Sequence, residues 1–198
     1  MAVPPPRPPA APRGRMNPDK LALRAQLRAA RDAFAAEGSS AIVAPAAFVD
    51  RLAPGMVVAT YYPIGSEADP TQLAAAAAEC GCTLALPFVV DRAAPIRFLA
   101  WDLGEPLGIG PFGLRQPEPG GPEVAPDVIL TPLVGFDARF NRLGQGAAHY
   151  DRAFARYPEA WRVGVAWSVQ QVPAVPADIW DEPLHAVITE EGMLWHNP

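Results

Sequence analysis

The sequence predicts an α/β protein: a three-layer α/β/α domain, Rossmann-like, around a largely parallel, mixed sheet. Two observations favour this class. Short apolar segments rich in β-branched residues alternate with segments of helical periodicity, and strands that alternate with helices usually pair in parallel and are covered on both faces. Half of the 198 residues are hydrophobic, which suffices for one sizeable core in a chain of this length.

The first residues differ from the rest in composition. Residues 1–16 are rich in proline, which lacks a backbone N–H and fixes φ, so neither a helix nor a central strand is expected there. They contain no apolar segment typical of a secretory signal. We expect a disordered tail over 1–16, with Met16 as an alternative start, and a single domain over 17–198.

A long helix is predicted over residues 17–37. Asn17 suits the N-cap, Pro18 the first helical position and Asp19 the positive end of the helix dipole. Apolar side chains then recur at helical spacing on one face, which we expect to pack on the core. These are Leu23, Leu27, Ala30 and Phe34.

A basic stripe adjoins this apolar face. Its members are Lys20, Arg24, Arg28 and Arg31. For Arg28 and Arg31 we favour a solvated face over a ligand contact. Lys20 and Arg24 lie in the first turns, from which they can reach into a ligand site.

The next segments alternate between helix and strand patterns. A short helix is predicted over 45–52, and a β-rich apolar run predicts a buried strand over 56–62. Asp69 or Thr71 caps a helix that Gly81 ends.

The second half continues the alternation. A helix is predicted over 147–157, after a glycine-rich loop. Residues 104–126 are rich in proline and glycine, which indicates an ordered excursion across the surface rather than a second domain. Further strands are predicted over 83–89, 96–101, 128–132, 162–167 and 186–189.

Composition argues against several functional classes. The net charge of -5 argues against a nucleic-acid binder with a broadly positive surface. No apolar run reaches the roughly 20 residues that cross a bilayer. Cys80 and Cys82 are only one residue apart, too close for an easy disulfide, and are interpreted as reduced thiols. We expect a cytoplasmic monomer with small-molecule partners and neither nucleic acid nor membrane.

Two segments follow predicted strands at the edge where open α/β sheets bind ligands. One is YYPIGSEADP, which contains Glu67; the other contains RLGQGAAHYDR. In the second, glycines 144 and 146 let the backbone approach a bulky anion, and Arg142 can contact phosphate oxygens. Asp151 can hold a hard divalent cation. By itself the pattern is also compatible with a simple turn, and it matches neither a P-loop nor a dinucleotide motif.

Several motifs in a fixed order identify a family resemblance. The chain resembles the 5-formyltetrahydrofolate cyclo-ligase family in seven segments. These are an N-terminal Lys with an Arg four residues on, the segment ending at Glu67, IRFLAW, GPFGLRQP, TPLVGFD, RLGQGAAHYDR and WDEPLHAVIT. The similarity extends over residues 17–195. It implies an enzyme with a cyclo-ligase-like catalytic domain that uses ATP and Mg²⁺ to close 5-formyltetrahydrofolate, with or without a polyglutamate tail, into 5,10-methenyltetrahydrofolate.

The resemblance also implies roles for individual residues. Arg142 and Lys20 are expected to act in catalysis, and Asp151 and Asp181 to hold the metal. The folate is expected on Glu67, Tyr62, Phe112 and Tyr150. Tyr61 and Tyr62 could both stack on the pterin, although tyrosines in an apolar strand are more often core residues. The ATP site is expected to comprise Lys20, Arg24, Arg142, Gly144, Gln145, Gly146, Ala147, Ala148, His149 and Tyr150.

The chain departs from the family pattern at two places. Ala147, Ala148 and His149 replace glycine and an aromatic residue, from which we expect altered affinity rather than lost activity. His185 stands where some members offer a second metal carboxylate, and Asp181 is the nearby substitute. Two other readings remain open: a non-catalytic folate- or nucleotide-binding protein on the same fold, and a sugar-phosphate isomerase-like enzyme, which would not need ATP.

Overall fold

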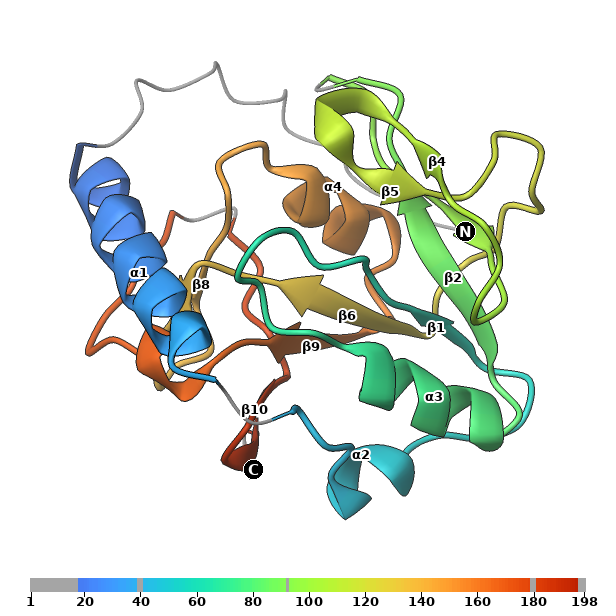
Figure 1. Ribbon diagram of the computed structural model, residues 1–198, viewed down its shortest axis with the longest axis horizontal. Coiled ribbons are helices and arrows are strands. Elements are labelled where there is room, and N and C mark those ends of the chain that lie inside the picture. The colour runs from blue at the N-terminus through green and yellow to red at the C-terminus, as the bar shows by residue number, and fades with distance from the viewer. Residues whose placement is uncertain (1–17, 39–40, 92, 179–180, 196–198) are drawn as a thin grey trace, which may run out of the picture.

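Seven strands form one mixed sheet (Figure 1), in the order β11-β10-β9-β6-β1-β2-β3. The computed structural model describes residues 18–38, 41–91, 93–178 and 181–195. The five inner strands are parallel, and the edge strands β3 and β11 are antiparallel to their neighbours. The strands are β1 (Val57–Ala59), β2 (Thr83–Phe88), β3 (Arg97–Ala100), β6 (Val128–Pro132), β9 (Trp161–Val165), β10 (Ala186–Thr189) and β11 (Gly192–Trp195).

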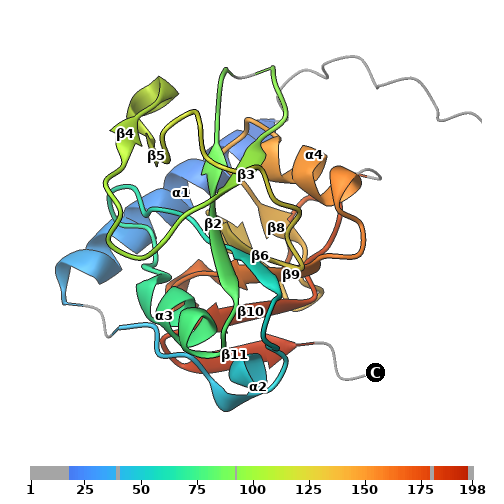
Figure 2. The same cartoon turned by 90° about the vertical axis from the view of Figure 1, so that its right-hand side faces the viewer.

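Helices cover both faces of this sheet, as Figures 1 and 2 show. Helices α2 (Ala46–Val49) and α3 (Thr71–Glu79) lie on one face, and α4 (His149–Arg156) lies on the other. Neighbouring strand residues accordingly divide between two cores: Val58 belongs to the α3 side and Ala59 to the α4 side. The predicted three-layer α/β/α architecture is therefore confirmed.

Helix α1 (Pro18–Ala36) lies beyond the edge at which β6 and β1 end (Figure 1). Its Leu27 packs in a small separate core with Val134 and Leu143. A Cβ on Gly135 would overlap Leu27 Cδ1, so this close approach of helix and backbone depends on glycine. Phe34, near the end of the helix, lies against Trp167 with ring centroids 5.7 Å apart.

The boundaries of several predicted elements were wrong. The strand predicted over 56–62 spans only Val57–Ala59, because the chain leaves the sheet so that the Tyr61 hydroxyl can donate to the Ala68 carbonyl at 2.5 Å. The helix predicted from residue 147 begins at His149, because Ala148 has left-handed dihedrals with φ 53°. The helix predicted over 45–52 has a single turn, Ala46–Val49.

Several short elements were missed by the sequence prediction. The excursion over 104–126 is ordered, as predicted, and contains a small hairpin. Strand β11 also had no counterpart in the prediction. The missed short elements are β4 (Gly108–Ile109), η1 (Pro111–Gly113), β5 (Arg115–Gln116), β7 (Gly135–Phe136), β8 (Arg142–Leu143) and η2 (Ser168–Gln170).

Other sequence predictions have simple outcomes. Cys80 and Cys82 are free thiols, as expected. Among the described residues, no helix combines the length and apolarity needed to cross a bilayer. The tail predicted over 1–16 and the N-cap predicted at Asn17 lie outside the part of the chain that the structure describes.

Candidate active site

The candidate site lies where the order of strands changes direction. From β1 the chain passes through α3 to β2 on one side, whereas β6 pairs on the other side of β1. Ligands of open α/β sheets bind at the carboxyl edge of such a switch point. Both segments that the sequence predicted to bind ligands leave the sheet at this edge, and helix α1 lies against it (Figure 1).

The glycine loop is held against helix α1. The Arg24 guanidinium donates from Nε to the Gly144 carbonyl at 2.8 Å. Gly146 has φ 101°, a conformation that favours glycine, and it lies beside the Arg24 guanidinium: a Cβ there would be in ordinary contact with Arg24 Cζ, at 3.8 Å. Burial, followed by the charge of Arg28, lowers the pKa of Arg24. An anion bound here would oppose both effects.

Arg142 and Asp151 form an ion pair at the start of α4. Arg142 Nη2 donates to Asp151 Oδ1, and the guanidinium lies over the Phe154 ring at 4.6 Å from its centroid. The Arg142 side chain is only 6% exposed, yet its Nη1 has no hydrogen-bond partner among the described residues. A buried donor without a partner is costly, so this atom suits an incoming acceptor such as a phosphate oxygen.

Lys20 forms a second cluster with two carboxylates. Its Nζ lies 2.7 Å from Asp178 Oδ2 and 3.0 Å from Asp181 Oδ2. Burial lowers the pKa of Lys20, but the hydrogen bonds to both carboxylates outweigh burial and raise it overall. Asp181, predicted as a metal ligand, therefore contacts a predicted ATP-binding cation in this structure.

No preformed three-ligand metal site is found in the described parts of the chain. No group of three or more His, Cys, Asp or Glu side chains there could hold a metal ion. Asp151 and Asp181 instead each face a cation of the predicted ATP site. This arrangement still fits Mg²⁺, which is commonly held by one or two carboxylates together with substrate phosphates.

Glu67 lies at the meeting point of the two predicted segments. Its side chain is 7% exposed; Oε2 accepts the Ile64 N–H at 3.1 Å, and Oε1 accepts Gln145 Nε2 at 3.0 Å. Gln145 belongs to the glycine loop, and its Oε1 accepts a hydrogen bond from Arg28 at 2.5 Å. The structure thus brings the candidate phosphate loop and the candidate folate carboxylate into direct contact.

Arg31 was wrongly predicted to lie on a solvated face. The residue is 7% exposed, because the loop that contains Glu67 covers this part of the basic stripe. Arg31 Nη1 lies 3.8 Å from Glu67 Oε1. Arg28 is exposed, as predicted. Helical periodicity cannot reveal a counter-charge that is distant in sequence. The regular spacing of the basic stripe did, however, align Arg31 with the other cations of the helix.

The predicted aromatic contacts divide into buried and exposed groups. Tyr61 is 5% exposed and belongs to the core. Burial, and then the negative charge of Glu67, raises the pKa of Tyr150. Tyr62 is 44% exposed, with the Arg115 guanidinium 5.1 Å from its ring centroid. Phe112 is also exposed, on the β4–β5 hairpin that Arg115 belongs to.

The two histidines singled out by sequence lie in different places. His149 begins α4, within the glycine-loop region, and its Nδ1 lies 2.9 Å from Arg152 Nη2. His185 immediately precedes β10, so it lies at the amino edge of the parallel strands, opposite the candidate site. Its Nε2 is 2.9 Å from Arg162 Nη2. The expectation that His185 replaces a metal carboxylate is therefore not supported by its position.

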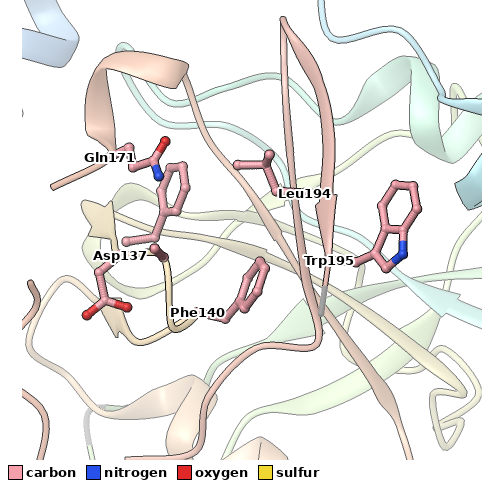
Figure 3. A pocket seen from close by; sticks show the side chains of 7 residues that line it. Asp137, Phe140, Gln171, Leu194 and Trp195 are labelled. Carbon is pink, nitrogen blue, oxygen red and sulfur yellow. The ribbon is translucent and has the colours of Figure 1, made fainter. Parts of the chain in front are cut away.

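Two surface hollows lie apart from the candidate residues. One of 260 Å³ is shown in Figure 3, where Asp137 and Phe140 follow β7, and Leu194 and Trp195 belong to β11. The Asp137 carboxylate accepts hydrogen bonds from Val175 N and Asn141 Nδ2 at 2.9 and 3.0 Å. Burial opposes ionisation, but the hydrogen bonds prevail and lower its pKa. Asp137 therefore has a structural role: it fixes the turn that leads into the glycine loop.

The other hollow, of 460 Å³, lies at the amino edge of the sheet. Trp161 and His185, at the starts of β9 and β10, are part of its lining. Neither hollow is lined by a predicted ATP, folate or metal residue.

Fold and site together define a three-layer α/β protein with a cationic glycine loop and an acidic residue at the switch point of its sheet. The chain belongs to the 5-formyltetrahydrofolate cyclo-ligase family, whose model matches residues 16–190. The match includes all four helices and both predicted ligand segments.

Relatives with this family's name are similar over parts of the chain. A 5-formyltetrahydrofolate cyclo-ligase of Haemophilus influenzae is 35% identical over 97 residues, which are 46% of this chain and 52% of that protein. The Escherichia coli K12 protein of the same name is 43% identical over 65 residues, 32% of this chain and 36% of that protein. The chain thus spans about half or less of these two relatives. The Mycolicibacterium smegmatis cyclo-ligase is 32% identical, over 68% of this chain and 74% of its own.

Solved structures agree over most of the fold. The 5,10-methenyltetrahydrofolate synthetase of Aquifex aeolicus superposes with a TM-score of 0.65 at 29% identity, covering 89% of this chain and 92% of its own. The synthetase of Mycoplasma pneumoniae has a TM-score of 0.61 at 22% identity, covering 87% and 99%. The second similarity supports the fold alone.

Proposed function

We propose that this chain catalyses the ATP- and Mg²⁺-dependent cyclisation of 5-formyltetrahydrofolate to 5,10-methenyltetrahydrofolate, with release of ADP and phosphate. The observation that carries this proposal is the 3.0 Å contact between Gln145 Nε2 and Glu67 Oε1. It joins a loop suited to phosphates and a carboxylate suited to the N–H groups of a pterin at one switch point. Membership of the family supports the same reaction.

The ATP phosphates are assigned to the glycine loop and the cations around it. Arg24 lies beside Gly146, and Arg142 offers a buried Nη1 donor without a partner among the described residues. Lys20 extends the positive charge along α1, and its carboxylate partners hold it in place. Asp151, 29% exposed beside Arg142, offers an oxygen ligand for Mg²⁺, with Asp181 as the second candidate. Bound Mg²⁺ would neutralise phosphate charge in the transition state.

The folate is assigned to Glu67 and the aromatic residues near it. Glu67 would accept hydrogen bonds from the amino and ring N–H groups of the pterin, and Tyr150 is assigned to the same ligand. Tyr62 and Phe112 are exposed and would cover the ligand from the loop and from the β4–β5 hairpin. The contact between Arg115 and Tyr62 links these two elements.

The chemistry requires positioning and charge stabilisation rather than a protein nucleophile. The formyl oxygen attacks the γ-phosphorus, and the bond from that phosphorus to the ADP oxygen breaks. The neighbouring side-chain nitrogen of the folate then attacks the formyl carbon and closes the ring. This nitrogen loses its proton to solvent, and the carbon–oxygen bond to phosphate breaks as phosphate leaves. Arg142 and Lys20 are assigned to stabilise the transferring phosphoryl group.

We expect the enzyme to act as a cytoplasmic monomer.

An absorbance assay tests the proposed function. Purified protein is mixed with 5-formyltetrahydrofolate and ATP, with and without Mg²⁺, and the methenyl chromophore is followed. We expect product only when ATP and Mg²⁺ are both present. A folded protein that binds ATP and folate but forms no product would contradict the proposal and favour the binding-protein interpretation. Product formed without ATP would also contradict it.

A further inference from the structure

We propose that Arg31 is a positioning residue that holds Glu67 in the orientation needed to bind the folate. The role assigned to Glu67 rests on the proposed function; the contacts of Arg31 do not. Arg31 and Glu67 are separated by 36 positions in the sequence. Their side chains are only 8% and 7% exposed. Burial of both charges at this edge indicates that the pair has a specific structural purpose.

A single guanidinium contacts two successive residues of the loop. Arg31 Nε donates to Ser66 Oγ at 2.9 Å, and Nη1 lies 3.8 Å from Glu67 Oε1. The donors of a guanidinium lie in one plane at fixed directions, so the hydrogen bond to Ser66 also directs Nη1 toward the Glu67 carboxylate. A lysine in this position would provide charge but not this geometry.

Other contacts hold Ser66 on two further sides. Its hydroxyl donates to Asp32, the next residue along α1, and its carbonyl accepts the Trp167 indole N–H at 2.9 Å. Trp167 follows β9 and also packs on Phe34 of α1. The residue before Glu67 is thus tied both to helix α1 and to the segment that follows β9, and this fixes the backbone from which the Glu67 side chain extends.

The contact between Arg31 and Glu67 is incomplete in this structure. Arg31 Nη1 is buried and has no hydrogen-bond partner among the described residues, and 3.8 Å is beyond hydrogen-bond distance to Glu67 Oε1. That oxygen is shared with Gln145 of the glycine loop. If the pterin or nucleotide displaces Gln145, the Arg31 donor is next to Glu67 and can take over the stabilisation of its charge.

Steady-state kinetics of Arg31→Met and Arg31→Lys test this role. Arg31→Met is expected to raise KM for 5-formyltetrahydrofolate about tenfold or more and to leave KM for ATP within about twofold. Arg31→Lys should recover part of the loss because it restores the charge. Arg162→Met is the matched control: its side chain is 12% exposed and pairs with Glu182 at 3.2 Å, near the start of β9 at the opposite edge. Thermal melts identify variants that fail to fold.

Amide hydrogen exchange provides a readout that does not depend on activity. The Ile64 and Glu67 amides are suitable probes, since Ile64 N donates to the Glu67 carboxylate and Glu67 N donates to the Ile64 carbonyl at 3.2 Å. Both amides should exchange faster in Arg31→Met than in the wild type. In Arg162→Met their exchange rates should equal those of the wild type. Unchanged exchange, or an unchanged folate KM in an active enzyme, would overturn the inference. If the wild type has no cyclo-ligase activity, the proposed function is refuted. Faster exchange in Arg31→Met would still support the positioning role in that case.

Discussion

At the scale of single residues, the site is a set of opposite charges that neutralise one another. Asp151 pairs with Arg142, and Asp181 pairs with Lys20. Each pair combines a predicted metal ligand with a predicted phosphate ligand. A Mg²⁺–phosphate complex carries both signs of charge. Mg²⁺ can replace the cation beside each carboxylate, and phosphate can replace the carboxylate beside each cation, so binding would change the net charge of the site little.

Replacement of Asp151 tests the metal role. Asp151→Asn keeps the shape and one acceptor oxygen for Arg142 but removes the negative charge that favours Mg²⁺. We expect turnover at fixed Mg²⁺ to fall about tenfold or more, with partial recovery at higher Mg²⁺. A magnesium titration of initial rates measures this. The control is Glu123→Gln, whose carboxylate pairs with Arg97 and Arg156 on the surface. Near-normal turnover of Asp151→Asn would contradict the assignment.

His185 gives a prediction for the pH dependence of stability. Burial, and then the charges of Arg162 and Arg51, lowers the pKa of His185 from its ordinary 6.5. The unfolded chain therefore takes up this proton at a higher pH than the folded chain does. Stability contributed by neutral His185 is present above pH 6.5 and is lost as the pH falls below it.

Chemical denaturation at pH 7 and pH 5 measures the effect. The free energy of unfolding of the wild type should fall more between these two values than that of His185→Gln, which has no proton to take up at this position. Equal pH dependence in both proteins would show that the histidine does not titrate differently in the folded state.

Residue types predicted which charged side chains gather at this edge of the sheet, but not how they pair. Lys20, Arg24, Arg142 and Glu67 all lie at the predicted edge of the sheet. Arg31 was missed because its partners, Ser66 and Glu67, are distant in sequence. His185 was misplaced because a motif match gives an order along the chain, whereas the direction of β10 decides at which edge a residue lies.

At the scale of elements, helix α1 is the support of the site. It contributes Lys20, Arg24 and Arg31, and it contacts the η2 segment and the small core around Leu27. Its position depends on Gly135 of β7, where any Cβ would meet Leu27 Cδ1 and lie 3.3 Å from the Gln170 carbonyl. The contact between α1 and β7 therefore helps to position the cations that this helix contributes to the candidate site.

Substitution of Gly135 tests this dependence. Gly135→Ala should lower the free energy of unfolding by about 1–3 kcal/mol, because Leu27 must move and α1 with it. Turnover should fall as well, since the helix positions three site residues. Denaturation and initial-rate measurements on the same samples check both. Gly120→Ala is the control, as its Cβ would meet nothing within 4 Å. An unchanged stability for Gly135→Ala would show that α1 is free to shift.

Elements with strong periodicity were predicted from sequence, and short ones were not. The strands over 83–89 and 128–132 and the helix of the basic stripe agree closely with the structure. Strands β4, β5, β7 and β8 each have two residues, too few for any alternation. They form through pairing across turns, and such pairing leaves no local pattern.

At the scale of the whole molecule, the order of strands brings the two ligand segments together. β1 leads into the loop of Glu67, and β6 leads through β7 and β8 into the glycine loop. Because β1 and β6 are neighbours and parallel, both segments leave the sheet at the same edge. The fold class, read from the alternation of helices and strands, was therefore sufficient to place the two candidate segments at one edge, while the contact through Gln145 required the structure.

Calorimetric titration of single variants shows whether the folate and the nucleotide bind on these two segments of one site. Glu67→Gln and Arg24→Met are each titrated with 5-formyltetrahydrofolate and with a non-hydrolysable MgATP analogue. We predict that Glu67→Gln weakens folate binding about tenfold or more and nucleotide binding by less than about twofold, and that Arg24→Met shows the reverse. If both variants bind both ligands as the wild type does, or each weakens the ligand assigned to the other segment, the site lies elsewhere on the molecule.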